Sequence, residues 1–222
     1  MSSAVIQLLV LAGIAIFLIL RLRSVLGTRE GYEKPPVPLN KGGTEGNRPR
    51  REFEVIEGGI DRDITDHVED GSPAAKALAA MKMAEPGFNV SEFLQGARGA
   101  YEMILMAFEQ GDLEQVRPFL ADDVYSAFEE VVNERERQGL TVEANFVGVR
   151  DVSLIGAEFD RGESRGEVTV RFVGEMTSVV RDATGDVVEG DPTAIRRQKD
   201  VWTFARKLGA SNPNWQLVAT GE

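Results

Sequence analysis

The sequence contains no cysteine and only one histidine, His67, among its 222 residues. Without cysteine the chain has no disulfides, thiolate metal ligands or cysteine nucleophile. A single histidine excludes multi-histidine zinc sites and leaves little material for acid–base catalysis. His67 lies in the polar stretch DRDITDHVEDG, which has Asp66 and Ser72 at the positions where a calcium loop needs glycine and glutamate. We therefore expect His67 to be a solvent-exposed imidazole, and we predict no catalytic, cofactor-binding or metal-binding residue.

Negative charge dominates, and most of it lies in the C-terminal part of the chain. Residues 88–222 hold 14 Lys and Arg against 24 Asp and Glu, so they carry −10 of the net charge of −11. An acidic domain repels nucleic acid and anionic lipid. We predict no nucleic-acid binding. Solubility explains the charge most simply, and basic protein partners are the alternative.

A single long apolar run occupies residues 4–20, with Gln7 as its one polar residue. As a helix it spans about 26 Å, close to the hydrocarbon core of a bilayer. No Lys or Arg precedes the run and arginines follow it, which is the reverse of a cleaved signal peptide. We predict one retained transmembrane helix within residues 1–27. Its apolar side chains include Ala4, Leu8, Leu11, Phe17 and Leu20, and its flanking cations are Arg21 and Arg23.

The flanking arginines also predict the orientation of the chain. Cationic flanks stay in the cytoplasm. The N-terminus is therefore expected outside a bacterial inner membrane and the C-terminal domain on its cytoplasmic face.

Residues 28–72 are predicted to be a flexible linker, because Pro, Gly and alternating charges dominate them up to about residue 59. Ser72-Pro73 then begins an Ala/Met-rich helix, and Pro86-Gly87 ends it, giving a short helix or connector over 73–87.

Residues 88–139 have helical periodicity. We expect Ser91 to cap the first helix and Gly111 to end it. Gly96 and Gly99 lie inside that helix, where glycine lowers stability, so we expect another element to approach them closely.

After Gly139 the apolar period changes to two. The candidate strands cover 141–149, 150–159, 166–181, 195–207 and 215–220. Helices followed by hairpin-linked strands predict an α+β fold in which one face of an antiparallel sheet is covered, forming a cone.

Neither the carboxylates nor the aromatic residues identify a catalytic site. Glu129, Glu130, Glu134 and Glu136 fall on a polar helix surface, and Glu167 and Glu175 are expected to face solvent. The basic cluster 195–200 is expected to be a solvated strand edge, with contact to the membrane or to a partner as the alternative. Tyr101, Phe108, Trp202, Phe204 and Trp215 form an aromatic set that either packs as core or lines an apolar binding pocket.

Two stretches carry a resemblance to a known family. They read FLQGARGAYEMILMAFEQGDLEQVRPFLADDVYSAFEEVVNERERQG and VWTFARKLGASNPNWQLVAT. Together they resemble the Tim44-like domain, over about residues 88–222. An N-terminal membrane helix followed by a polar linker is similar to the layout of the alphaproteobacterial members.

The resemblance implies a nuclear-transport-factor-2-like (cystatin-like) cone with an apolar pocket, and a non-enzymatic adaptor. Such an adaptor binds a protein partner or client in protein translocation or membrane-protein biogenesis. The partner implied is a chaperone, a translocon or a ribosome. Two alternatives stay open: a secretion-system component of the same fold, and a protein whose pocket binds lipid or a small molecule.

Overall fold

The computed structural model describes residues 61–221. The predicted transmembrane helix, its flanking Arg21 and Arg23 and most of the predicted linker lie outside these residues. Within 61–221 no helix combines the length and the apolar character needed to cross a membrane.

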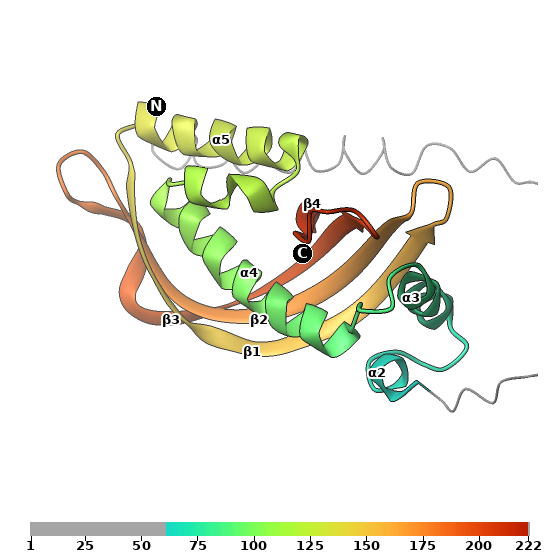
Figure 1. Cartoon of the computed structure of the whole chain (residues 1–222). Coiled ribbons are helices and arrows are strands. Elements are labelled where there is room, and N and C mark those ends of the chain that lie inside the picture. The colour runs from blue at the N-terminus through green and yellow to red at the C-terminus, as the bar shows by residue number, and fades with distance from the viewer. Residues whose placement is uncertain (1–60, 222) are drawn as a thin grey trace, which may run out of the picture. The chain divides into compact units, whose positions relative to one another are not determined.

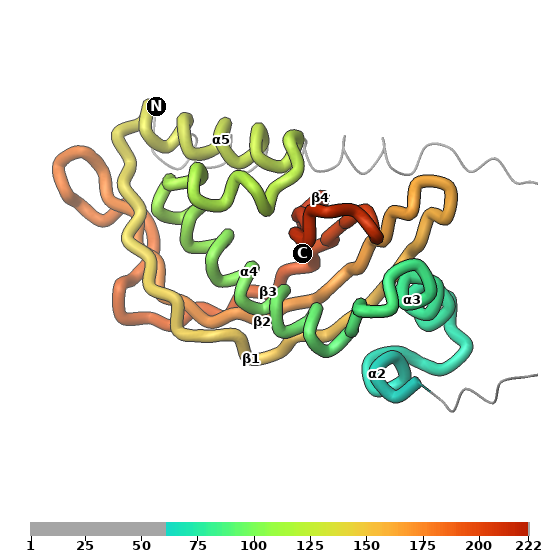
Figure 2. The backbone as a smooth tube through the Cα atoms, viewed as in Figure 1, coloured from blue at the N-terminus to red at the C-terminus, as the bar shows by residue number. Residues whose placement is uncertain are grey.

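In residues 61–221, five helical segments and four strands make an α+β fold, with helices packed on an antiparallel sheet in the order β1-β2-β3-β4 (Figure 1). The helical segments are α2 (Arg62–Thr65), α3 (Pro73–Ala84), α4 (Val90–Gln110), η1 (Glu114–Phe119) and α5 (Asp122–Arg137). The strands are β1 (Thr141–Asp160), β2 (Arg165–Arg181), β3 (Val187–Lys207) and β4 (Gln216–Gly221). The backbone trace shows β1, β2 and β3 curving around α4 (Figure 2). The predicted α+β class with an antiparallel sheet is confirmed.

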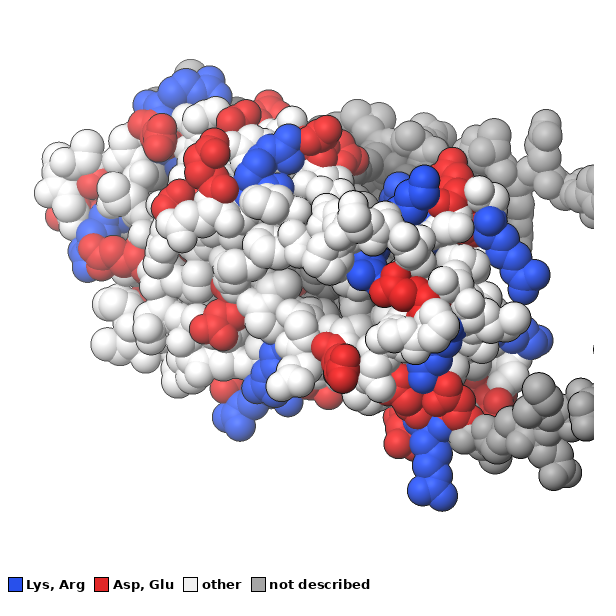
Figure 3. All heavy atoms as spheres, viewed as in Figure 1, with Lys and Arg blue, Asp and Glu red and all other residues white. Residues whose placement is uncertain are grey.

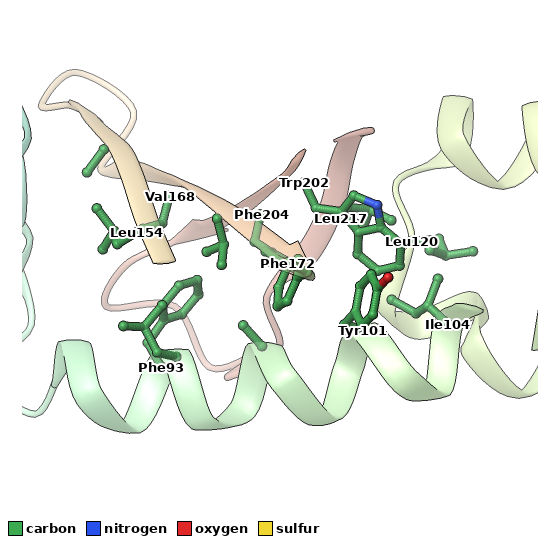
Figure 4. Close-up of a cluster of buried hydrophobic side chains, with 14 of the residues drawn as sticks. Phe93, Tyr101, Ile104, Leu120, Leu154, Val168, Phe172, Trp202, Phe204 and Leu217 are labelled. Carbon is green, nitrogen blue, oxygen red and sulfur yellow. The ribbon is translucent and has the colours of Figure 1, made fainter. Parts of the chain in front are cut away.

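Apolar side chains on the inner face of the sheet meet one stripe of α4 to form the core. Phe93, Tyr101 and Ile104 point from α4 towards Val168, Phe172, Trp202 and Phe204 on the strands (Figure 4). Alternation along β2 places Val168, Val170 and Phe172 inward and Glu167, Thr169 and Arg171 on the opposite face.

The start of α4 differs from the expectation, because Asn89 and not Ser91 is the N-cap. Asn89 has an extended backbone, and its side chain accepts a hydrogen bond from the Glu92 N–H at 2.8 Å. The helix ends as expected at Gly111, which adopts φ 78°.

The prediction that another element approaches Gly96 and Gly99 is wrong. A Cβ at either position would have no neighbour within 4 Å, because both residues lie on the solvent side of α4.

Two of the strand boundaries also differ. The candidates 141–149 and 150–159 form the single strand β1, with register shifts against β2 after Phe146, Val149 and Leu154. These bulges interrupt the alternation and bend the strand without ending it. β3 begins at Val187 rather than at 195, and its pairing with β2 shifts between Arg196 and Asp191, around Pro192.

Candidate functional site

Three of the five predicted aromatic residues lie in the packed core. Tyr101, Trp202 and Phe204 are at most 4% exposed. Tyr101 stacks on Phe172 with a centroid distance of 4.5 Å, and Trp202 lies 4.8 Å from Tyr101 (Figure 4). This part of the concave face is therefore filled by the chain's own side chains.

The other two aromatic residues lie at separate places around that core. Phe108 packs on Phe128 of α5 at 4.7 Å, and Trp215 packs on Phe93 at 4.8 Å. The five residues therefore do not surround a common cavity in the described structure, and their role in pocket lining stays a prediction.

Asp200 of β3 contacts this core at Tyr101, although the sequence did not single it out. The Tyr101 hydroxyl donates to Asp200 Oδ2 at 2.5 Å. Burial, and then the neighbouring Asp200 carboxylate, raise the pKa of Tyr101 far above its usual value. The phenol therefore stays protonated and holds α4 to β3, which is a structural role.

Glu175 was expected to face solvent, and this prediction is wrong, because the residue is 8% exposed. It lies between Arg150 of β1 at 2.7 Å and Arg197 of β3 at 3.1 Å. Hydrogen bonds from Arg150 and Arg197 lower the pKa of Glu175. An ionised, doubly paired carboxylate cannot serve as a general acid at neutral pH. Glu167 is half-buried, and Glu129 and Glu130 are exposed on α5.

A polar cluster attaches α2 to the first turn of α4. Asp63 accepts hydrogen bonds from the Val90 N–H at 2.8 Å, the Ser91 N–H at 3.0 Å and the Ser91 hydroxyl at 2.8 Å. Asp63 also forms an ion pair with Lys82 of α3 at 2.7 Å. Partial burial would raise the pKa of Asp63, but the bonds from Lys82, Val90 and Ser91 outweigh burial and lower it far below the usual value. Asp63 thus supplies the acceptors that the first N–H groups of α4 need.

His67 belongs to the same cluster, so the expectation of a lone exposed imidazole is wrong. It is half-buried, and its Nε2 lies 3.1 Å from the Ser91 hydroxyl. The serine gives its only proton to Asp63, so His67 must donate from Nε2. The order Asp–Ser–His is not that of a catalytic triad, where the histidine lies between the other two and accepts the serine proton.

Arg206 of β3 makes a second junction that the sequence did not suggest. Its guanidinium pairs with Glu85 after α3, donates to the Pro213 carbonyl at 3.2 Å and lies over the Trp215 ring at 5.3 Å. Glu85 also accepts from the Gly209 N–H at 2.9 Å.

A groove of about 710 Å³ lies between the start of α3 and the outer face of the sheet. We call it the α3–β1 groove. Its apolar wall is formed by Val68, Pro73, Ala74, Leu154, Ile155 and Ala157. Its charged wall carries Glu69, Glu158 and Glu167, and His67 and the hydroxyls of Ser72, Thr169 and Thr203 complete it. Acidic side chains also gather over α2 at this end of the molecule (Figure 3).

This groove does not have the composition of a metal or acid–base site. In residues 61–221 no three His, Asp or Glu side chains converge as metal ligands. The lining residues include no Lys or Arg that would hold a phosphate or carboxylate. The groove can therefore hold apolar and cationic groups, and we treat it as an interaction surface.

Comparison with known proteins identifies the family. The model of the Tim44-like domain matches residues 74–222. The human mitochondrial import inner membrane translocase subunit TIM44 is 25% identical over 168 residues, covering 71% of this chain and 36% of its own. The rat subunit is 23% identical with the same coverage.

A Caenorhabditis elegans protein, probable mitochondrial import inner membrane translocase subunit tin-44, is 28% identical over 119 residues, covering 52% of this chain and 27% of its own. Superposition on the crystal structure of the intermembrane space region of the chloroplast protein ARC6 covers 57% of this chain and 93% of the ARC6 chain, with a TM-score of 0.40 and 12% sequence identity. The chain matches about a third of the length of the human relative. Because the family model spans residues 74–222, which include α4, α5 and the whole sheet, the chain belongs to the Tim44-like domain family.

Proposed function

We propose that this protein is a membrane-anchored, non-enzymatic adaptor that binds a protein partner or client during protein translocation or membrane-protein biogenesis. The observation that carries the proposal is the Tim44-like match over residues 74–222, with relatives named as translocase subunits. The predicted anchor in residues 1–27 would hold the domain at the cytoplasmic face of the inner membrane, and the fold would be a nuclear-transport-factor-2-like cone.

Two features of the site support binding rather than catalysis. The aromatic residues of α4 and the sheet are packed against each other, and the buried Glu175 is neutralised by two arginines. The α3–β1 groove instead offers an open surface of mixed apolar and acidic character. A chaperone, a translocon subunit or a ribosomal protein is the class of partner that we propose.

Crosslinking followed by mass spectrometry in intact cells tests the proposal, with the full chain compared with a variant that lacks residues 1–27. We expect crosslinks from the domain to membrane proteins, chaperones or ribosomes, and we expect them to fall when the anchor is deleted. A C-terminal reporter fusion that is active only outside the cytoplasm would contradict the orientation. The absence of any domain-dependent partner would contradict the adaptor role.

A further inference from the structure

The α3–β1 groove contains two glutamates that face each other. Glu158 of β1 and Glu167 of β2 are directly paired in register, and both line the groove. Like charges opposite each other on neighbouring strands destabilise a sheet. Arg165 pairs with Glu167 at 2.9 Å, whereas Glu158 has no cationic partner among residues 61–221. A third carboxylate, Glu69, lines the groove from the α2–α3 connection.

An exposed apolar side chain lies beside these carboxylates. Ile155 is 49% exposed because it is the extra residue of the β-bulge between Leu154 and Gly156. The bulge therefore turns an isoleucine out of the sheet and into the groove wall. Val68, Pro73 and Ala74 form the apolar wall on the helix side.

The carboxylates and the exposed Ile155 together indicate which chemical groups a ligand of the groove would carry. A lysine or arginine bound beside Glu158 would gain a carboxylate partner and relieve the repulsion between Glu158 and Glu167. An aliphatic side chain next to that lysine or arginine in the bound peptide would cover Ile155, and both apolar side chains would leave water. The lining residues include no Lys or Arg, and the cation beside them is Arg165, which pairs with Glu167 and leaves Glu158 and Glu69 for a ligand.

We propose that the α3–β1 groove is a docking site for a segment of a partner protein that carries lysine or arginine next to aliphatic residues. The inference rests on the proposed adaptor function and adds the location and the chemistry of the contact. The partner's cation would offset the repulsion between Glu158 and Glu167.

Fluorescence anisotropy with the full chain in a non-ionic detergent tests this site. The probe is a short fluorescein-labelled peptide of alternating lysine and leucine, with a glutamate–leucine copy as the reversed-charge control. We compare Glu69→Lys/Glu158→Lys in the groove with Glu102→Lys/Glu130→Lys on exposed faces of α4 and α5, which changes the net charge equally. The groove pair should raise the Kd about tenfold, and the helix pair by less than about twofold.

The conservative variant Glu158→Gln separates binding from folding. Removal of the like charge should raise the Tm by about 1–3 °C. The same variant should weaken peptide binding about threefold. Equal loss of binding in both charge-reversal pairs, or no binding by the wild type up to about 1 mM peptide, would overturn the proposal. If cellular crosslinks to partners persist while groove variants bind normally, the groove proposal fails and the adaptor function stands.

Discussion

Replacement of Gly174 by alanine tests how tightly the aromatic core holds Tyr101. An added Cβ would lie 2.7 Å from the Tyr101 hydroxyl, and ordinary contact begins at 3.4 Å, so the ring must retreat by about 0.7 Å. Tyr101 has no room for this movement, because it is fully buried, stacked on Phe172 and hydrogen-bonded to Asp200. We expect a loss of about 2–3 kcal/mol in the free energy of unfolding, or about 5–10 °C in Tm.

The matched test is a double-mutant cycle with Tyr101→Phe. This change alone should cost about 1–2 kcal/mol through the lost hydrogen bond to Asp200. In that background the nearest ring atoms would lie 3.1 Å and 3.3 Å from the new Cβ, so Gly174→Ala should cost less than about 1 kcal/mol.

Trp202 and Trp215 are the only two tryptophans of the chain and both lie in the domain, so intrinsic fluorescence during urea unfolding of the full protein reports on it. Additive effects of the two substitutions, or a neutral Gly174→Ala, would refute the reasoning.

Other predictions concern α4 and the two junctions around it. Asp63→Asn should cost about 2 kcal/mol at neutral pH, because it removes the charge that binds Lys82 and the first turn of α4. Because folding lowers the pKa of Asp63, the stabilisation that Asp63 gives the fold is present above about pH 4 and is lost as the pH falls. The urea midpoint of Asp63→Asn should therefore fall less with acid than that of the wild type. Gly96→Ala and Gly99→Ala should each raise stability by about 0.5–1 kcal/mol, measured as Tm, and a decrease would mean that a neighbour approaches these positions after all. Glu85→Gln should lower the free energy of unfolding in urea by about 1–2 kcal/mol, because Arg206 and the Gly209 N–H lose their anionic partner. The hydrogen bond from Gly209 and the pairing with Arg206 lower the pKa of Glu85, so this stabilisation is also lost as the pH falls.

Much of the architecture could be predicted from local signals. Gly111 ended α4, Pro73 began α3, and the change of apolar period after Gly139 marked the start of the sheet. These signals depend on neighbours in sequence, and a linear pattern records them directly.

The errors arose where residues distant in sequence meet. Glu175 is buried because Arg150 and Arg197 reach it from the strands on either side, which no alternation pattern reveals. Ser91 looked like a cap, but its hydroxyl donates to Asp63, 28 residues earlier in the chain. The solvent position of Gly96 depends on which stripe of α4 meets the sheet, and that stripe is set by contacts with strands distant in sequence.

The attachment of α2 by Asp63 has a mechanical consequence. Among the described elements α2 comes first in the chain. A pulling force applied from the N-terminal side would therefore act on the contacts of Asp63 before it acts on the sheet. Three hydrogen bonds to Val90 and Ser91 and the ion pair to Lys82 would then carry the load together, and rupture would have to break them almost simultaneously. A pulled molecule should therefore release α2 in a discrete step, while α3 stays attached through its buried Leu78 and Met81 and through the Glu85–Arg206 pair.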